Sequence, residues 1–255
     1  MKAVIAIPAY KCAAQIPRVL DEITEDLASR VEEIWVLDNR SPDDTAEVAA
    51  EYAKSGRLTN LKVFRNRQNN NLGGTHKVAF QQAARRGFTH VLILHGDNQA
   101  RSDEANRLLD YAEAHPDTQT VLGSRFMPGS VLKGYDFKRI AGNRVLNTIY
   151  SLVTLRRCRD LGSGLNLFAL ADLDPGTYLS FANSLTFNFE LLLDLVKRKV
   201  RFAYVPITWR EEDQVSNARN LNIFTTGLVN LFRWRIGLAS PPPPEGLDYE
   251  FDQVA

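Results

Sequence analysis

The stretch Val91-Leu-Ile-Leu-His-Gly-Asp-Asn-Gln99 decides the fold, because four apolar residues run directly into a polar turn. A short apolar run bounded by turn residues is typical of a buried strand in a parallel sheet. Open α/β sheets bind their ligands at the C-terminal ends of such strands. His95, Asp97 and Gln99 alternate, so an extended backbone would turn all three side chains toward one side. We expect them to hold a divalent cation and, through it, a diphosphate, with a capped strand-to-helix turn as the alternative.

Strand and helix signals alternate along the chain, and this alternation is typical of a parallel sheet flanked by helices. Apolar runs predict strands at residues 3–7, 33–37, 61–64, 91–95, 120–123, 165–169 and 202–207. Apolar residues at helical spacing predict helices at residues 16–27, 41–52, 73–86, 103–114, 134–155 and 187–197. The sequence has no internal repeat and no low-complexity linker. We therefore expect one α/β domain with a mostly parallel central sheet flanked by helices.

Composition limits the possible functions. The 255 residues carry a formal net charge of +1, which gives no reason to expect binding to nucleic acid. Cys12 and Cys158 have neither the number nor the spacing of a disulfide framework or a metal site. No apolar run approaches the roughly 18–20 residues that a transmembrane helix requires. The chain opens on a strand rather than on a secretory leader, so we expect a cytoplasmic protein.

The C-terminal part is expected to differ from the domain of residues 1–222 that precedes it. Residues 223–239 mix large apolar side chains with Arg233 and Arg235, which predicts an amphipathic helix. Such a helix can pack on the core, or it can lie at a membrane surface, here the inner face. Residues 240–255 contain consecutive prolines and end in an acidic segment, so we expect a loosely ordered tail.

Polar residues follow three of the predicted strands at the point where each strand ends. Pro8-Ala-Tyr10 follows the first strand, Asp38 and Asn39 follow the second, and His95-Gly-Asp97 follows the fourth. The ends of parallel strands meet at one edge of a doubly wound sheet, where they form a nucleotide pocket. Asp38 can accept hydrogen bonds from a base or a ribose there, or it can cap the helix that follows.

A glycine pair and a lysine add two further candidates. Gly73-Gly74 permits close approach of the backbone to a ligand. Lys77, about one helical turn later, can meet a phosphate or simply face solvent. The expected nucleotide contacts are therefore Pro8, Ala9, Tyr10, Asp38, Asn39, Gly73, Lys77 and Gly96.

Further motifs follow one another along the chain. In order, they are Ile5–Tyr10, Val36–Thr45, Asn71–Thr75, His95–Asp97 with Gln99, Gly123–Phe126, Asp160 with Ser163-Gly164, Phe187–Glu190 and Val205–Pro206. In this order they resemble the family 2 glycosyltransferases of GT-A fold. The resemblance is strongest to the polyprenyl-phosphate sugar transferase branch, typified by dolichyl-phosphate mannose synthase, and spans residues 1–220.

The sequence departs from that family at several positions. Lys11-Cys12 stands where the family has Asn-Glu, and Asn39 and Arg40 replace an acid and a glycine. His95 replaces the first acid of the Asp-x-Asp metal motif, and Asn166 replaces a basic residue. The departures concern the nucleoside and metal positions rather than the fold.

The resemblance implies a GT-A fold and an inverting transfer of a sugar from a UDP- or GDP-linked donor. Mn²⁺ or Mg²⁺ held by Asp97, with Gln99 or His95, would stabilise the leaving diphosphate as a Lewis acid. An imidazole among oxygen ligands suits Mn²⁺ at least as well as Mg²⁺. The implied acceptor is a polyprenyl phosphate at the cytosolic face of the membrane.

The acceptor decides which further residues are needed. A phosphate acceptor is already anionic and needs cations for positioning. The expected phosphate contacts are Arg125, Arg139, Arg210, Ser216 and Arg219, with an ordinary charged surface as the alternative. A glycan hydroxyl would instead need a general base, for which Asp160 is the preferred carboxylate, with a structural role beneath Ser163-Gly164 as an equal alternative. The candidate catalytic residues are Asp97, Asp160, Arg125 and Arg210.

Other classes fit the sequence less well. Transfer to a glycan hydroxyl remains open within the enzyme class, and Asn39 and His95 leave a non-catalytic nucleotide-sugar binder open. A pyrophosphorylase would need a glycine-rich phosphate loop after the first strand, which residues 8–12 lack. Gly162-Ser-Gly164 lacks the spacing and position of a dinucleotide-binding fingerprint, which argues against a dehydrogenase.

Overall fold

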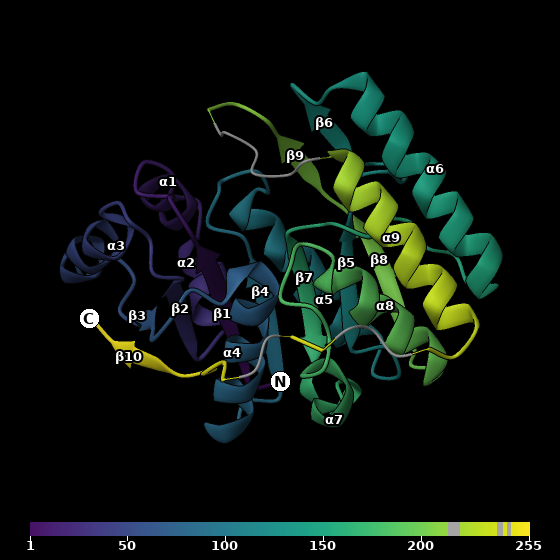
Figure 1. Ribbon diagram of the computed structural model, residues 1–255. Coiled ribbons are helices and arrows are strands. Elements are labelled where there is room, and N and C mark those ends of the chain that lie inside the picture. The colour runs from purple at the N-terminus through teal and green to yellow at the C-terminus, as the bar shows by residue number, and fades with distance from the viewer. Residues whose placement is uncertain (214–219, 239–241, 244–245) are drawn as a thin grey trace.

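The computed structural model describes residues 1–213, 220–238, 242–243 and 246–255 (Figure 1). Its strands are β1 (Ala3–Ala9), β2 (Glu33–Asp38), β3 (Leu61–Asn66), β4 (His90–Leu94), β5 (Thr120–Ser124), β6 (Val131–Lys133), β7 (Leu165–Ala169), β8 (Phe202–Pro206), β9 (Thr208–Arg210) and β10 (Phe251–Gln253). Its α-helices are α1 (Ile16–Asp21), α2 (Glu25–Ser29), α3 (Thr45–Lys54), α4 (Asn71–Arg85), α5 (Ala105–Ala114), α6 (Phe137–Thr154), α7 (Pro175–Tyr178), α8 (Phe187–Lys197) and α9 (Asn220–Arg235). Short 3₁₀ turns lie at Ser102–Glu104 and Leu170–Asp172.

The central sheet contains eight strands in the order β10-β3-β2-β1-β4-β7-β5-β8, and β6 pairs with β9 in a second sheet. The pairs β1–β2, β1–β4, β2–β3 and β5–β8 are parallel. β7 runs antiparallel to β4 and β5, and β10 runs antiparallel to β3. The predicted mostly parallel α/β sheet is confirmed. The reversed β7 brings the start of its strand to the edge where its neighbours end.

Helices cover both faces of the sheet (Figure 1), which explains why its central strands are apolar throughout. All seven residues of β1 are buried, and alternate residues belong to different core clusters. Ile5 and Ile7 share a cluster with residues of α1, α2, α3 and α5. Val4 and Ala6 share the other cluster with residues of α4, α6, α8 and α9. The two-residue period of a strand thus supplies both cores from one segment.

The single helix predicted at residues 16–27 is interrupted. The second helix, α2, begins after Thr24, whose side chain accepts a hydrogen bond from the Leu27 amide. A threonine in this position favours a new helix start. The break leaves the Glu22 carboxylate beside β9, where it accepts hydrogen bonds from Arg210. This contact between the N-terminal helices and β9 supports the candidate site.

The predicted amphipathic helix is α9, and one of its faces packs on the core. Leu231 is buried, and the Trp234 indole donates to the Leu193 carbonyl of α8 at 3.0 Å. Val229 and Phe232 are exposed on the other face. Core packing is therefore confirmed for one face of the helix. None of the helices in the described part of the chain is long and apolar enough to cross a membrane.

The C-terminal residues 246–255 lie against the sheet, so the expectation of a loose tail was wrong for this part of residues 240–255. β10 pairs with the edge strand β3, and Phe251 stacks on Phe64 with ring centroids 4.1 Å apart. The Glu250 side chain accepts a hydrogen bond from Gln82 at 2.6 Å. The prediction was based on the polar and acidic composition of the segment. A short edge strand can nevertheless pack on the sheet through one buried aromatic residue, here Phe251, while its other residues are polar.

Phe251→Ala should lower the free energy of unfolding by about 3 kcal/mol, because it removes a buried ring. That ring stacks on Phe64 and meets the edge of Trp35. Urea unfolding followed by tryptophan fluorescence measures the change. Gln253→Ala, at an exposed position of the same strand, is the control and should change stability by less than about 0.5 kcal/mol. Equal stability of the two variants would show that β10 adds nothing to the sheet.

Candidate active site

The ends of β1, β2 and β4 lie together at one edge of the sheet. The Asn39 amide donates to the Ala9 carbonyl at 2.9 Å, and the Gly96 amide donates to the Pro8 carbonyl at 3.0 Å. A Cβ on Gly96 would lie 3.1 Å from that carbonyl oxygen, so glycine lets the two strand ends meet. The structure therefore brings together the polar segments that follow the first, second and fourth strands of the parallel set.

Each of these three strand ends is followed by a residue with left-handed backbone. Lys11, Arg40 and Asn98 have φ angles of 57°, 56° and 57°. Such a conformation costs a residue other than glycine about 1–3 kcal/mol, and residues of this kind gather at ligand sites. The sequence does not mark these positions, but their common location identifies this edge as the candidate site.

The turn after β4 is not extended, so the alternation argument for His95, Asp97 and Gln99 was wrong. Asn98 is left-handed, and the Asp97 carboxylate accepts a hydrogen bond from the Gln99 amide at 3.3 Å. The Gln99 carbonyl in turn accepts from the Arg210 amide at 2.8 Å. A tight turn braced by β9 replaces the extended exit, and side chains in such a turn do not alternate between two faces.

The His95 imidazole packs against Gly164 and His76. The His95 amide donates to the Gly164 carbonyl at 2.9 Å, and a Cβ on Gly164 would lie only 2.7 Å from His95 Nδ1. The centroids of the two histidine rings are 5.5 Å apart. Burial lowers the pKa of His95, and its Nε2 is buried without a hydrogen-bond partner among the described residues. The site thus contains an imidazole whose buried Nε2 is available to a ligand.

Asp97 supplies the carboxylate of the β4 turn. Burial raises the pKa of this half-buried side chain, and the nearby His95 and Arg125 act in the opposite direction. Across the described ranges, no group of three or more His, Cys, Asp or Glu side chains is placed to bind a metal. Mg²⁺ sites commonly use one or two carboxylates together with substrate phosphates. The donors of this turn fit a cation of that kind, completed by a diphosphate.

The polar residues after β2 are engaged within the protein. The buried Asp38 carboxylate accepts from the Ser41 amide at 3.0 Å and from Arg65 Nε at 2.8 Å. The Asn39 side chain accepts from the Asn70 amide at 2.9 Å and so holds the loop that leads into α4. Asp38 caps the turn after its strand, which is close to the alternative considered for it. Any contact of these oxygens with a base would be additional to the bonds they already make.

The remaining predicted nucleotide contacts separate into two kinds. Tyr10 is 37% exposed at the end of β1, where its ring can stack on a base. A Cβ on Gly73 would lie 2.6 Å from Phe187 Cβ, so this glycine admits α8 rather than a ligand. The buried Lys77 amine donates to two carbonyls of the loop before α8 and to Asn183 Oδ1. The expected phosphate contact of Lys77 is therefore corrected to a structural role.

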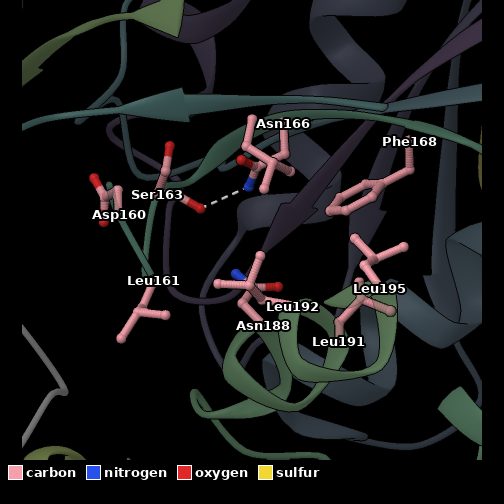
Figure 2. Close-up of a pocket in the computed structure, with 10 residues that line it drawn as sticks. Asp160, Leu161, Ser163, Asn166, Phe168, Asn188, Leu191, Leu192 and Leu195 are labelled. Carbon is pink, nitrogen blue, oxygen red and sulfur yellow. Dashed lines mark hydrogen bonds between the residues drawn. The ribbon is translucent and has the colours of Figure 1, made fainter. Parts of the chain in front are cut away.

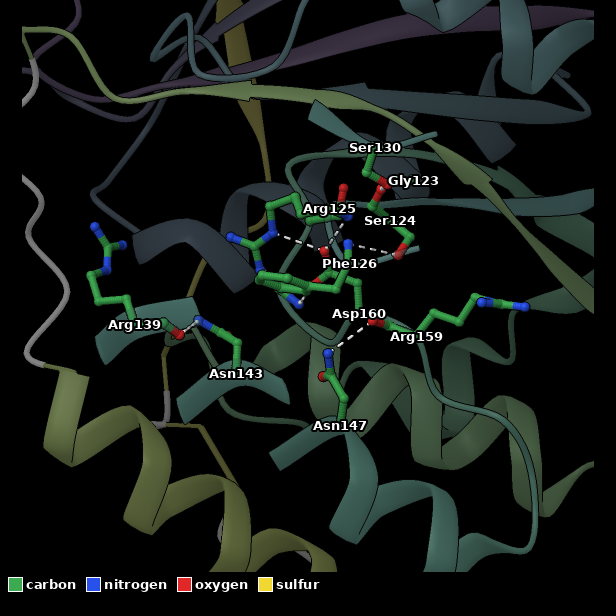
Figure 3. Close-up of polar contacts among 12 residues, drawn as sticks. Gly123, Ser124, Arg125, Phe126, Ser130, Arg139, Asn143, Asn147, Arg159 and Asp160 are labelled. Atoms are coloured by element: carbon green, nitrogen blue, oxygen red, sulfur yellow. Dashed lines mark hydrogen bonds and ion pairs between the residues drawn. The ribbon is translucent and has the colours of Figure 1, made fainter. Parts of the chain in front are cut away.

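Arg125 and Asp160 form a buried ion pair (Figure 3). Arg125 Nε and Nη2 each donate to the carboxylate at 2.8 Å, and the Arg125 amide donates to it at 2.9 Å. Burial opposes the charge on the guanidinium, but the carboxylate of Asp160 raises the pKa of Arg125. The Gly162 amide also donates to this carboxylate at 3.0 Å, so both oxygens of Asp160 are already engaged within the protein. The structural role considered for Asp160 is the one that its contacts support.

Arg210 braces the β4 turn from β9. Its two Nη atoms donate to the Glu22 carboxylate at 2.7 and 3.0 Å, and Nη2 also donates to Asn98 Oδ1 at 3.0 Å. These contacts hold the left-handed residue between Asp97 and Gln99. Arg210 therefore positions the predicted metal ligands in this structure. The predicted phosphate contacts Ser216 and Arg219 lie outside the described residues.

A cavity of about 430 Å³ opens beside Arg125. Its lining consists of Arg125, Phe126, Met127, Pro128, Ser130, Leu132 and Arg144. Arginines bind phosphate through several N–H groups at once, and the apolar side chains between them suit an apolar extension of a ligand. Arg139, predicted for the same phosphate, is instead paired with Glu211. The cavity fits a ligand with one anionic and one apolar part.

A second, internal cavity of about 20 Å³ lies between β7 and α8 (Figure 2). On its wall, Asn166 Nδ2 donates to the Ser163 carbonyl at 2.8 Å. Asn188 Oδ1, also on the wall, is buried and has no hydrogen-bond partner among the described residues. A volume of this size holds about one water molecule, which excludes a sugar or a nucleotide. Asn166 thus belongs to the structure beneath the site.

Three residues of the site were not predicted. Glu22 holds Arg210, the Trp209 ring lies 4.9 Å from the Arg125 guanidinium carbon, and Arg144 lines the larger cavity. Glu22 and Arg210 are 188 residues apart in the chain. No spacing or periodicity in one sequence connects positions so distant, so only the fold reveals them.

Asp160→Asn should lower the free energy of unfolding by about 3–5 kcal/mol, because it leaves the buried Arg125 charge without its partner. Urea unfolding measures this loss. Asp117→Asn removes an exposed ion pair with Arg201 and should cost less than about 1 kcal/mol. If Asp160→Asn instead kept full stability and lost only sugar transfer, Asp160 would be a general base after all.

Lys77→Met should cost at least about 2 kcal/mol of stability, because buried acceptors lose their donor. The affinity for a nucleotide sugar should remain that of the wild type once the variant is studied below its melting temperature. Isothermal titration with the donor, beside thermal unfolding, separates the two effects. Weaker donor binding at unchanged stability would restore the phosphate contact that the sequence predicted.

Comparison with known proteins agrees with the fold and with the resemblance found in the sequence. One relative is the polyprenol monophosphomannose synthase of Mycolicibacterium smegmatis. It is 24% identical over 216 residues, which cover 83% of this chain and 78% of that protein. The crystal structure of glucosyl-3-phosphoglycerate synthase from Mycobacterium tuberculosis in complex with UDP has a TM-score of 0.68 at 18% identity. That match covers 94% of this chain and 81% of the other.

A second structure of the same M. tuberculosis enzyme contains Mn²⁺, UDP-glucose and phosphoglyceric acid, and matches with a TM-score of 0.68 at 16% identity. It covers 99% of this chain and 86% of the other. These likenesses confirm the predicted GT-A fold. The family model for glycosyl transferase family 2 matches residues 4–166, more than half of the 255 residues. The protein is therefore a member of glycosyl transferase family 2, a family of nucleotide-sugar glycosyltransferases.

Proposed function

We propose that this glycosyltransferase moves a sugar, with inversion, from a UDP- or GDP-linked donor to an acceptor that carries a phosphate, with polyprenyl phosphate as the first candidate. The observation that carries the proposal is the cavity between Arg125 and Arg144, which combines two guanidinium groups with apolar walls. It opens beside Arg125, at the sheet edge that also carries Asp97. An acceptor of this kind sits in a bilayer, so the cytoplasmic enzyme would work at the inner membrane face.

The names of the relatives support a phosphate acceptor. One is a polyprenol monophosphomannose synthase, and the other is a glucosyl-3-phosphoglycerate synthase. The acceptors in these names differ in size and polarity, but both carry a phosphate. Their structures and names also support a UDP-linked donor and Mn²⁺, since the M. tuberculosis enzyme binds both.

On the donor side, Asp97 would provide the anionic ligand of the cation, assisted by Gln99 or His95. The cation, Mn²⁺ or Mg²⁺, would act as a Lewis acid on the leaving diphosphate. Tyr10 would stack on the base at the rim of the pocket. Arg210 would keep the turn in place through its bonds to Glu22 and Asn98. The chain's own contribution is thus to hold one carboxylate where a diphosphate can complete the metal site.

On the acceptor side, the arginines would position an oxygen that is already anionic. Arg125 uses Nε and Nη2 on Asp160, while its Nη1 approaches the Tyr135 hydroxyl at 3.4 Å. The remaining N–H groups of Arg125, with those of Arg144, would bind the phosphate. A hydroxyl acceptor would need a base, and Asp160 is already committed to its ion pair. This disfavours transfer to a glycan hydroxyl.

Asp97→Asn should abolish the thermal stabilisation that a nucleotide sugar gives in the presence of Mn²⁺ or Mg²⁺. Melting temperatures would be measured with UDP- and GDP-linked sugars, each with metal and with EDTA. Burial raises the pKa of Asp97, so its charge costs folding free energy at neutral pH. The unliganded variant should therefore melt at the same temperature as the wild type or above it.

The matched control is Asp103→Asn, an aspartate on the following turn that pairs with Arg101. It should keep the stabilisation by the donor. Donor stabilisation that survives EDTA and Asp97→Asn would contradict the metal site. Tight donor binding without sugar transfer or donor hydrolysis would favour a non-catalytic binder.

A further inference from the structure

An apolar stripe runs along the exposed side of α6. Phe137, Val145 and Leu152 are 78%, 51% and 70% exposed. They are spaced by about two helical turns, so they lie on one side of the helix. Leu155, directly after the helix, is 88% exposed and has left-handed backbone with φ of 55°. Because these side chains are exposed, they add little to the stability of the fold. Leu155 also has a strained backbone conformation, which costs free energy of folding.

α9 continues this apolar surface. It lies beside α6 at the end of the molecule opposite β10 (Figure 1), and the Tyr150 hydroxyl of α6 donates to the Gly227 carbonyl of α9 at 2.7 Å. Phe232 and Ile236 are 64% and 52% exposed. We call the exposed sides of α6 and α9, together with Leu155–Arg157, the α6–α9 surface. Exposed apolar side chains that gather on neighbouring helices, unlike single ones, are typical of an interaction surface.

Basic residues predominate on this surface, although Arg139 of α6 is paired with Glu211. Residues 137–159 contain no Asp or Glu and six basic residues, which are Lys138, Arg139, Arg144, Arg156, Arg157 and Arg159. Residues 220–235 of α9 also lack Asp and Glu and include Arg233 and Arg235. The whole chain has a formal net charge of only +1. Positive charge is therefore concentrated on the side of the molecule that also exposes its apolar side chains.

We propose that the α6–α9 surface docks on an anionic lipid bilayer. Basic residues beside exposed Leu, Phe and Val side chains are the composition that binds such interfaces. A symmetric dimer through the same surface would place positive charge against positive charge, which disfavours a second copy as the occupant. Anionic headgroups complement the arginines, while the apolar side chains enter the boundary of the acyl chains.

The proposal deepens the proposed function and rests on it in one respect, the lipid nature of the acceptor. Arg144 belongs to α6 and also lines the cavity beside Arg125. Docking through α6 would place this cavity next to the headgroup layer. A polyprenyl phosphate could then present its phosphate to the two arginines while its chain stays in the bilayer.

Vesicle binding without any nucleotide sugar tests the proposal. Co-sedimentation would compare vesicles of phosphatidylcholine alone with vesicles of phosphatidylcholine and phosphatidylglycerol. The wild type should bind the anionic vesicles, and added salt should weaken this binding. Leu152→Ser/Leu155→Ser and Arg156→Glu/Arg157→Glu should each reduce the affinity by about tenfold or more.

Matched controls lie on the far side of the molecule. Val254→Ser removes a valine that is 44% exposed beside β10, and Lys54→Glu reverses an exposed charge on α3. Both should bind vesicles as the wild type does. Wild-type protein that ignores anionic vesicles, or variants that all bind equally, would overturn the proposal. Concentration-dependent dimerisation lost in Leu152→Ser/Leu155→Ser would also overturn it, in favour of a second copy.

Stabilisation by a donor sugar, measured on the same variants, separates this proposal from the proposed function. None of the substituted residues belongs to the donor site, so donor stabilisation should persist in all of them. Vesicle binding without donor stabilisation would leave the docking surface standing and remove the proposed donor site. Donor stabilisation without vesicle binding would leave the proposed donor site standing and remove the docking surface.

Discussion

The buried ion pair between Arg125 and Asp160 is the interaction on which the rest of the site depends. It joins the end of β5 to the segment that enters β7, and it places a guanidinium over the Trp209 ring at the wall of the larger cavity. A buried guanidinium needs a partner of opposite charge with matching geometry, and a bidentate carboxylate provides it. The pair fixes the position of the arginine and engages both oxygens of Asp160. The cavity beside this arginine would therefore suit the anionic acceptor that we propose.

In the proposed function, the donor and acceptor halves of the site would each balance the negative charge of a substrate in a different way. A diphosphate donor and a phosphate acceptor repel each other, so each needs its own source of positive charge. The donor half presents Asp97 in a turn held by Arg210 and Glu22, which suits a shared cation. The proposed acceptor half would use Arg144 and the N–H groups of Arg125 that Asp160 leaves available. Anionic substrates of both kinds can then meet at one edge of the sheet.

The fold and the meeting of the strand ends that form the candidate site could be predicted from the sequence because they depend on local patterns. Apolar runs ending in polar turns marked β1, β2 and β4, and the rules of parallel sheets placed their ends together. The roles of individual side chains could not be predicted, because their partners are distant in the chain. Lys77 finds Asn183 106 residues away, and Arg210 finds Glu22 188 residues away. A left-handed residue such as Asn98 likewise leaves no periodic signal.

Sugar transfer to polyprenyl phosphate, compared with transfer to the matching polyprenol, tests the central claim most directly. Both lipids would be offered in the same anionic vesicles with a labelled nucleotide sugar and Mn²⁺. Product formation with polyprenyl phosphate and none with polyprenol is the result that an arginine-bound anionic acceptor predicts. Equal transfer to the polyprenol, or transfer to a glycan hydroxyl in the absence of any phosphate acceptor, would contradict it.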